Sequence, residues 1–323
     1  MKKIAVFTSG GDAPGMNACV RAVVRTAIYN GVEVMGIIRG YKGMIEGDFV
    51  KLDSYSVSNI IQKGGTILKS ARCDEFRSKE WRQVAYDKVM DAGIEGMVAI
   101  GGNGTFTGAD LFLQDFNIPT IGCPGTIDND LYGTDYTIGY DTAVNTALDA
   151  IDKIRDTADS HDRVFFVEVM GRDAGYIAIQ CGIGGGAELV MVPENPDSFE
   201  SVIDTLKNGR ENKKTSAMVV VAEGEELGNA NVIAQKAKEA LPHMDIRVTN
   251  LGHIQRGGAP TALDRILASR MGMAAVEGLL AGRKSEMVGI INDQVAYTPF
   301  ADAIHKKKPL NKELIKMVNI LSI

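Results

Sequence analysis

The sequence of 323 residues has few cysteines, no excess of basic residues and no apolar run of membrane-spanning length. Its cysteines, Cys19, Cys73, Cys123 and Cys181, lack the spacing of metal ligands or redox motifs, which favours free thiols in a reducing compartment. With 35 basic and 41 acidic residues the net charge is −6, which argues against a nucleic-acid partner. The chain runs from Met1 into a strand-like stretch without a cleavage signal, so we expect a cytoplasmic protein that has no membrane contact.

Glycine is abundant, with 36 residues gathered in short clusters that punctuate a regular alternation of apolar runs and helical patterns. The alternation predicts an α/β fold with mostly parallel sheets covered by helices, and a site at the carboxyl ends of the strands. The predicted strands are residues 4–8, 32–38, 96–100, 120–123, 164–169, 189–192, 218–222 and 287–291. Predicted helices include residues 15–29, 79–92, 142–156 and 264–280.

Three glycine-rich loops each follow a predicted strand and precede a helical pattern, at residues 9–17, 101–105 and 170–175. Glycine lets backbone N–H groups approach a phosphate, and the N-terminus of the following helix adds a favourable dipole. Each loop alone is equally well explained by a tight turn. Together the three loops favour a ligand that carries several phosphates.

Residues 124–130 form an aspartate-rich loop with the sequence Pro-Gly-Thr-Ile-Asp-Asn-Asp. A carboxylate held near a substrate hydroxyl accepts its proton as a phosphoryl group is transferred, which suggests Asp128 as the base, with Asp130 and Thr126 beside it. Aspartate and asparagine also favour turns, so the spacing by itself leaves both explanations open.

Arginines lie beside these loops, and guanidinium groups bind phosphate in a bidentate manner. They are Arg72, Arg163, Arg172, Arg247 and Arg256. Arg256 belongs to residues 251–258, a segment that holds His, Gln and Arg between glycines. We expect this segment to contact a substrate phosphate.

These segments together resemble the bacterial ATP-dependent 6-phosphofructokinases along nearly the whole chain. The resemblance is carried by residues 8–17, 64–66, 70–72, 124–130, 133–139, 167–172, 251–258 and 264–270. It implies two similar three-layer α/β lobes with the active site in the cleft between them. The larger, ATP-binding lobe would comprise residues 1–138 and 252–302, and the smaller, sugar-phosphate-binding lobe residues 139–251 and 303–323.

The activity that the resemblance implies is a glycolytic one, the transfer of the ATP γ-phosphate to the 1-hydroxyl of fructose 6-phosphate, with Mg²⁺. The implied catalytic residues are Asp128, Thr126, Asp130 and Arg172, of which Arg172 would stabilise the transferring phosphoryl group. The implied ATP contacts are Gly11, Arg72, Cys73, Gly102, Asn103, Gly104 and Thr105. The implied sugar-phosphate contacts are Thr126, Ile127, Asp128, Arg163, Met170, Gly171, Arg172, Glu223, Arg247, His253, Ile254, Gln255 and Arg256.

The resemblance further implies a homotetramer, because Arg163 and Arg247 would reach the sugar phosphate of a neighbouring subunit. A nucleotide or phosphoenolpyruvate effector would bind between subunits, at Arg21, Arg25, Arg155, Gly186, Glu188, Lys213 and Lys214. Ser54 stands where the family often has an arginine, which weakens the expected effector contact. A solvated helix face explains Arg21 and Arg25 equally well.

Two glycines favour ATP as the phosphoryl donor. Pyrophosphate-dependent relatives typically carry aspartate in place of Gly104 and lysine in place of Gly125, and these side chains would occupy the space of the α-phosphate. A lipid or NAD kinase shares a loop like residues 101–105, but such an enzyme has no use for residues 124–130 and 251–258.

Asn103 departs from the family pattern, in which an aspartate at this loop helps to hold Mg²⁺. Asparagine has a similar shape but lacks the negative charge that this ion favours. The sequence therefore leaves three explanations open: a natural variant in which water and Asp128 or Asp130 hold the metal, a regulatory paralogue of low activity, and an introduced substitution.

Overall fold

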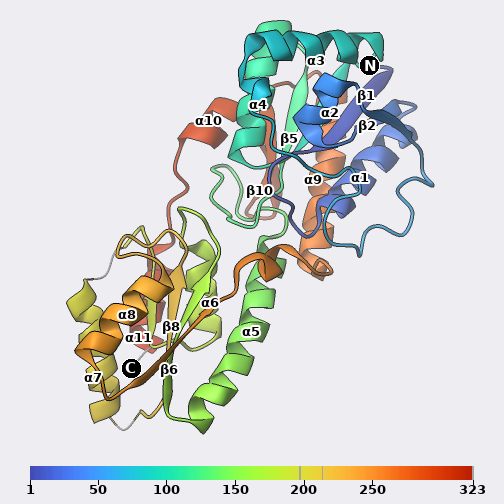
Figure 1. Cartoon of the computed structure of the whole chain (residues 1–323). Helices are drawn as coiled ribbons and strands as arrows, with labels where there is room; N and C mark the ends of the chain where they lie inside the picture. The colour runs from blue at the N-terminus through green and yellow to red at the C-terminus, as the bar shows by residue number, and fades with distance from the viewer. Residues whose placement is uncertain (196–197, 213, 322–323) are drawn as a thin grey trace. The chain divides into compact units, whose positions relative to one another are not determined.

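The computed structural model describes residues 1–195, 198–212 and 214–321, which form two compact units, each built from more than one stretch of chain. The first unit comprises residues 1–127, 131–142 and 256–308, and the second comprises residues 128–130, 143–255 and 309–323 (Figure 1). The chain thus crosses between the units several times, and no linker separates them. These bounds differ from the predicted lobes in four stretches: residues 139–142 and 303–308 belong to the first unit, and residues 128–130 and 252–255 belong to the second.

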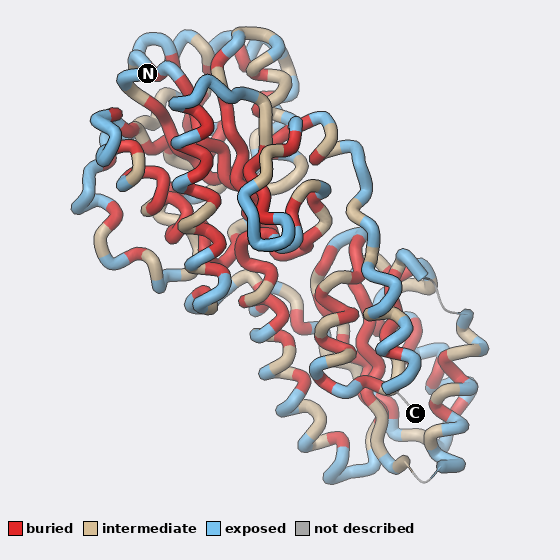
Figure 2. Tube along the Cα trace, turned by 180° about the vertical axis from the view of Figure 1, so that it is seen from behind, coloured by how far each residue is buried: buried red, intermediate tan, exposed pale blue. Residues whose placement is uncertain are grey.

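The first unit contains a seven-stranded sheet in the order β11-β10-β5-β4-β1-β2-β3. Its strands are β1 (Lys3–Thr8), β2 (Glu33–Ile37), β3 (Phe49–Leu52), β4 (Gly96–Gly101), β5 (Thr120–Pro124), β10 (Glu286–Ile291) and β11 (Gln294–Pro299). The five central strands are parallel, and β3 and β11 run antiparallel at the two edges. The central strands are buried, as the continuous apolar runs predicted (Figure 2).

Helices cover both faces of this sheet. They are α1 (Met16–Tyr29), α2 (Gly40–Glu46), η1 (Glu75–Arg77), α3 (Lys79–Asp91), α4 (Asn103–Phe116), α9 (Ala262–Leu280) and α10 (Phe300–His305). Phe7 and Ala99 point to the face on which Tyr41 of α2, Val89 of α3 and Phe112 of α4 pack. Because successive side chains of a strand alternate, their neighbours point to the other face, where α1 packs against α9.

The second unit contains a parallel four-stranded sheet in the order β7-β8-β6-β9. Its strands are β6 (Arg163–Val169), β7 (Leu189–Met191), β8 (Ala217–Ala222) and β9 (Asp245–Asn250). Its helices are α5 (Tyr140–Ser160), which starts in the first unit, α6 (Tyr176–Gly184), α7 (Phe199–Glu211), α8 (Ala230–Ala240) and α11 (Lys312–Leu321), and the short helix η2 (Gly252–Arg256) ends at the boundary. Val164, Phe166 and Val219 pack with apolar residues of α7 and α8 to form its core.

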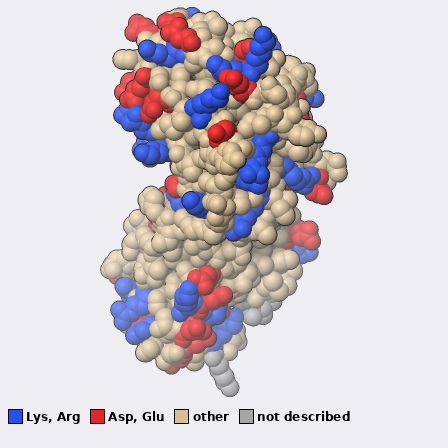
Figure 3. All heavy atoms as spheres, turned by 90° about the vertical axis from the view of Figure 1, so that its right-hand side faces the viewer, with Lys and Arg blue, Asp and Glu red and all other residues tan. Residues whose placement is uncertain are grey.

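Capping residues define where several helices begin. Ser198 precedes α7, Asn229 precedes α8 and Thr261 precedes α9, and each accepts a hydrogen bond from a backbone N–H in the first turn. Among the helices that the structure describes, none is both long and apolar enough to cross a membrane. The face drawn in Figure 3 carries basic and acidic side chains interspersed. The predicted α/β fold with parallel sheets flanked by helices is confirmed.

Candidate functional site

In the first unit, three loops that the sequence singled out follow adjacent strands. β1, β4 and β5 are neighbours and run parallel, so the loops after Thr8, Gly101 and Pro124 emerge at the same edge of the sheet. Two of these loops lead directly into helices, since α1 begins at Met16 and α4 at Asn103. The edge therefore presents helix N-termini, which favour anionic groups such as phosphate.

Hydrogen bonds join the three loops. Gly125 N donates to Gly101 O at 3.0 Å, and Ser9 N donates to Ile100 O at 3.0 Å. The Thr105 hydroxyl donates to Ser9 O at 3.2 Å. A Cβ atom at Gly101 would lie 2.2 Å from Thr105 Oγ1, so only glycine allows this contact. The structure thus brings together the first two glycine-rich loops and the start of residues 124–130.

Gly11 and Arg256, which are far apart in the sequence, are in contact at this edge. Arg256 Nη1 donates to Asp12 O at 3.2 Å. A Cβ atom at Gly11 would lie 2.6 Å from the same nitrogen. The guanidinium group that the resemblance assigns to the sugar phosphate therefore lies against a loop assigned to ATP.

The space around Gly104 and Gly125 bears on the phosphoryl donor. A Cβ atom at Gly104 would meet no atom within 4 Å, so the absence of a side chain leaves open space at the N-terminus of α4. A Cβ atom at Gly125 would lie 3.0 Å from both Ile100 Cγ2 and Met16 Cε, so a larger residue would crowd this turn. The open space therefore lies at Gly104, whereas close packing against buried side chains favours glycine at position 125.

Asn103 is the first residue of α4 and is the predicted metal ligand. Among the described residues, no group of three or more His, Cys, Asp or Glu side chains could hold a metal ion. The Asn103 side chain can contribute one neutral amide oxygen to an ion. Mg²⁺ commonly binds through few protein groups together with substrate phosphates, so the donor set fits an ion that arrives with a nucleotide.

The remaining predicted ATP contacts lie on the segment before α3. Arg72 is exposed, and the neighbouring Ser70 hydroxyl donates to Gly10 O of the first loop. Burial raises the pKa of the Cys73 thiol, which donates to Glu75 at 3.5 Å.

Tyr41 contacts the second glycine-rich loop and was not predicted from the sequence. Its buried hydroxyl donates to Thr105 O, and no local pattern signals this contact because α2 positions it.

Residues 128–130 belong to the second unit, and Ile127, the last residue before them, is buried. Asp128 is nearly buried, at 9% exposure. Burial raises the pKa of Tyr176, and the carboxylates of Glu194 and Asp130 contribute to the shift. Asp130 therefore lies close to the start of α6.

The third glycine-rich loop follows β6 in the second unit. Met170 N donates to Gln255 Oε1 at 3.0 Å, and Arg172 N donates to Glu223 Oε2 at 3.2 Å. Gly171 adopts a φ of +151°, and a Cβ atom there would lie 2.4 Å from Ala174 O. The structure thus groups these predicted sugar contacts through hydrogen bonds to backbone N–H groups.

The Arg172 side chain is exposed and close to one carboxylate, with Nε 3.6 Å from Asp173 Oδ2. Its φ of +55° is uncommon for a residue with a side chain. His253 and Ile254 lie on the short helix η2, and Ile254 is 56% exposed. These side chains are available to a ligand.

Arg163 and Arg247 lie together at the opposite end of the sheet. Both bind Asp245, with Nε–Oδ distances of 2.8 Å, and the hydrogen bond from Arg163 is the main cause that lowers the pKa of this carboxyl. Arg163 starts β6 and Met170 follows its end. At about 3.3 Å per residue they are about 23 Å apart, so one chain does not unite them in a single site.

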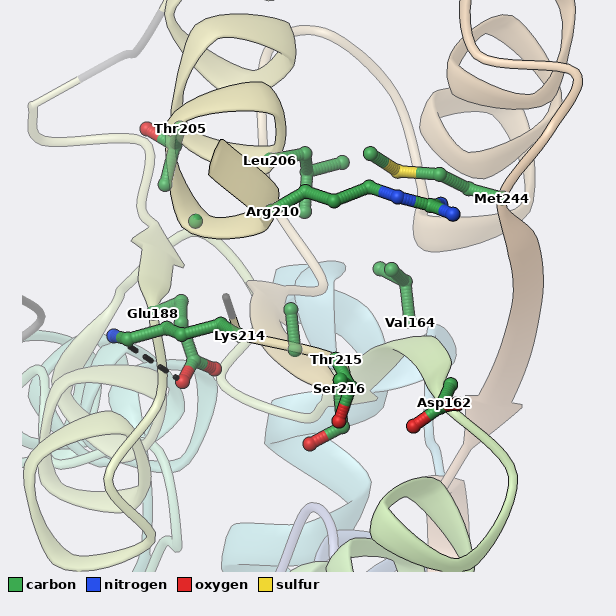
Figure 4. Close-up of a pocket in the computed structure, with 12 residues that line it drawn as sticks. Asp162, Val164, Glu188, Thr205, Leu206, Arg210, Lys214, Thr215, Ser216 and Met244 are labelled. Atoms are coloured by element: carbon green, nitrogen blue, oxygen red, sulfur yellow. Dashed lines mark ion pairs between the residues drawn. The ribbon is translucent and has the colours of Figure 1, made fainter. Parts of the chain in front are cut away.

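The predicted effector residues fall on both units. In the second unit, Arg155 Nη2 donates to Gly186 O at 2.7 Å, and Lys214 Nζ lies 3.8 Å from Glu188 Oε1 (Figure 4). Glu188 and Lys214 line a small pocket together with Asp162, Arg210 and Ser216, among others. In the first unit, burial and then the charge of Arg25 lower the pKa of Arg21. Lys213 lies outside the described residues.

Comparison with known proteins gives a consistent result. Residues 3–279 match the family described as Phosphofructokinase. The chain is 62% identical over 322 residues to an ATP-dependent 6-phosphofructokinase of Cytophaga hutchinsonii, with 100% of this chain and 98% of the relative covered.

Solved structures share the fold. A phosphofructokinase from Saccharomyces cerevisiae matches with a TM-score of 0.91 and 34% identity over 100% of this chain, which spans 48% of the yeast chain. A pyrophosphate-dependent phosphofructokinase from Marinobacter aquaeolei matches with a TM-score of 0.84 and 25% identity, covering 97% of this chain and 86% of that one. The chain belongs to the phosphofructokinase family.

Proposed function

We propose that the protein is an ATP-dependent 6-phosphofructokinase, which transfers the γ-phosphate of ATP to the 1-hydroxyl of fructose 6-phosphate. The observation that carries the proposal is the 62% identity over the whole chain to a relative named for this activity. The joined glycine loops after β1 and β4 support a polyphosphate donor. The open space at Gly104 and the tight turn at Gly125 favour ATP over pyrophosphate.

In this proposal Asp128 accepts the proton of the attacking hydroxyl, with Thr126 and Asp130 beside it. A nearly buried carboxylate is suited to this step because it meets little competing water. Arg172 offsets negative charge on the transferring phosphoryl group. The exposure of its side chain and the support of its backbone by Glu223 are consistent with that role.

Mg²⁺ would be held mainly by the phosphates of ATP, since this ion commonly binds through few protein groups together with substrate phosphates. When bound, it would supply positive charge opposite the phosphates during transfer. Asn103, at the N-terminus of α4, would approach this ion with an amide oxygen, while Gly11, Arg72, Cys73, Gly102, Gly104 and Thr105 would contact the nucleotide.

The sugar phosphate would be held by the loop after β6 together with Glu223, His253, Ile254, Gln255 and Arg256. Arg163 and Arg247 would bind the 6-phosphate of a neighbouring subunit in a homotetramer. The large separation of Arg163 from Met170 along β6 supports a model in which these two residues contact sugar phosphates in different active sites. An effector phosphate would bind near Arg155, Glu188 and Lys214.

The test is an assay for fructose 1,6-bisphosphate with ATP, Mg²⁺ and fructose 6-phosphate. We expect turnover with ATP and none above background for Asp128→Ala. Turnover with pyrophosphate alone would show that the donor is wrong. No turnover with either donor would favour a regulatory paralogue, for which Asn103 is the single motivating residue.

A further inference from the structure

Asp264, in the first turn of α9, is a fully buried carboxylate at the point where α5 begins. Its Oδ1 accepts a hydrogen bond from Gly139 N at 2.8 Å. Its Oδ2 accepts from Thr142 N at 2.8 Å and from the Thr142 hydroxyl at 2.5 Å. The first N–H groups of a helix lack partners within the helix, and a carboxylate there also opposes the positive end of the helix dipole. Asp264 therefore anchors the start of α5.

The start of α9 is tied to α5 in return. The Thr261 hydroxyl accepts from Asp264 N at 3.2 Å and donates to Asp141 Oδ2 at 2.6 Å. Thr261 N donates to the Thr142 hydroxyl at 3.0 Å. Two helix N-termini from distant parts of the sequence are thus joined by hydrogen bonds in both directions, which restricts how the turn before α5 can move.

That turn supports the segment that leads to the proposed base. Ile138 N donates to Pro124 O at 2.8 Å, and the Thr137 hydroxyl donates to Thr126 O at 2.6 Å. Thr126 precedes Asp128 by two residues in the chain. The path of the catalytic loop after β5 is thus supported by residues 137–138.

The same turn also contacts the first glycine-rich loop. Gly139 has a φ of +99°, and a Cβ atom there would lie 2.7 Å from Ala13 Cβ. A Cβ atom at Gly15 would lie 2.8 Å from Ile138 Cγ2. Residues 137–139 therefore lie between the loop proposed to hold ATP and the loop that leads to the base.

We infer that Asp264 is a positioning residue for phosphoryl transfer. It contacts neither substrate, but by anchoring residues 139–142 it sets the path of residues 124–126 and so the placement of Asp128. This inference rests on the proposed function. A carboxylate can accept from N–H groups on both of its oxygens, whereas an asparagine amide presents an N–H group on one side, which must face a donor. Asp264→Asn therefore loses part of the anchor with little change in shape.

The experiment compares Asp264→Asn and Thr137→Val with the unmodified enzyme. Because small displacements of a reacting group slow catalysis strongly, we expect kcat per folded molecule to fall about tenfold or more, with KM for ATP and fructose 6-phosphate changed by no more than about twofold. Amide hydrogen exchange should accelerate in residues 124–142 in both variants. Combining the two substitutions should lower kcat by less than the product of the single effects, since both act through one turn.

Asp115→Asn is the matched control. Asp115 of α4 accepts from Arg82 Nε at 2.7 Å, in a partly buried ion pair away from this turn. This variant should lower Tm but leave kcat per folded molecule and the exchange of residues 124–142 unchanged. The inference is overturned if Asp264→Asn behaves like Asp115→Asn.

Two further outcomes are separated by the design. If the unmodified protein does not form fructose 1,6-bisphosphate, the proposed function is wrong. Faster amide exchange of residues 124–142 in Asp264→Asn would then still show that Asp264 anchors this segment. If Asp264→Asn does not fold, Thr137→Val and Thr142→Val carry the test, because each removes one buried hydroxyl of the same network. Unchanged kcat in both threonine variants would then overturn the inference.

Discussion

Arg256 Nη1 lies so close to the backbone of Gly11 that a Cβ atom at Gly11 would come within 2.6 Å of it. The two residues are 245 positions apart, yet they belong to the same unit. Gly11 was predicted to contact ATP and Arg256 to contact the sugar phosphate. Their contact therefore joins the predicted sites of two different ligands.

Gly11→Ala should displace this guanidinium group. We expect kcat/KM for fructose 6-phosphate to fall about tenfold, because a phosphate contact from Arg256 would be misaligned. Val84→Ala is the control, since Val84 is an exposed residue of α3 that has no proposed ligand contact. The contact has no role in catalysis if both variants keep the original steady-state constants.

Asp128→Asn should remove the proposed base and keep the shape of the side chain. General base catalysis typically contributes about 10²- to 10⁴-fold, so kcat should fall by that range with little change in substrate KM. The measurement is steady-state kinetics with both substrates varied. A variant that retains more than about half of the original kcat would show that another group accepts the proton.

Asn103→Asp should strengthen the placement of Mg²⁺, because a carboxylate attracts this ion more than a neutral amide does. We expect half-maximal rate at a lower Mg²⁺ concentration and a higher rate at limiting Mg²⁺. The measurement is a Mg²⁺ titration at constant ATP, with Asn103→Ala as the comparison. Identical titration curves for all three proteins would contradict a metal contact at this position.

Arg163 and Arg247 should act across subunits. Arg247→Ala should raise KM for fructose 6-phosphate, and oligomers mixed from Arg247→Ala and Asp128→Ala chains should regain activity at low substrate concentration. Some sites in such oligomers would take Asp128 from one chain and Arg247 from the other.

A mixture of Asp128→Ala and Arg172→Ala chains is the control for this experiment. Both of these residues belong to the second unit of the same chain, so no combination restores a complete site. If the Arg247→Ala mixture gains no more activity than this control, the arginines do not serve a neighbouring subunit.

Asp264 predicts a distinct pH dependence of stability. Burial raises its pKa to about 6, against the lowering effect of hydrogen bonds from Thr142 and Gly139, while Asp141 raises it further. The folded state thus holds this proton more tightly than the unfolded state, in which the pKa is near 4. The contribution of protonated Asp264 to the free energy of unfolding is therefore complete below about pH 4 and is lost as the pH rises through about 6.

The side chain of Asp264→Asn cannot ionise, so the variant should not lose this stability as the pH rises. Between about pH 4 and pH 7, the free energy of unfolding of the variant should therefore change by about 2 kcal/mol in its favour relative to the unmodified protein. Urea unfolding of both proteins across this range measures the difference. A constant difference would show that the pKa of Asp264 is the same in the folded and unfolded states.

The central strands could be predicted from the sequence, whereas three others could not. β3, β9 and β11 are edge strands and are largely exposed, so they lack the continuous apolar run that marks a buried strand. β9 has the sequence Asp-Ile-Arg-Val-Thr-Asn, which resembles a polar loop when it is considered alone. It becomes a strand by pairing with β6, a tertiary interaction that its own sequence does not signal.

The candidate site shows the same limit. The glycine loops after β1 and β4 were predictable because strand, turn and helix succeed one another locally. The contact between Arg256 and Gly11 and the anchor of Asp264 on Gly139 join residues more than 100 positions apart. Such contacts depend on how strands and helices pack, and no local spacing encodes them.

The length of β6 has a consequence for how activity depends on protein concentration. With Arg163 at one end of this strand and Met170 beyond the other, the strand acts as a rigid spacer of about 23 Å. No rotation of side chains closes that distance. A sugar phosphate bound by both ends would require a second copy of the chain, so dilution below the dissociation constant of the oligomer should inactivate the enzyme before any subunit unfolds.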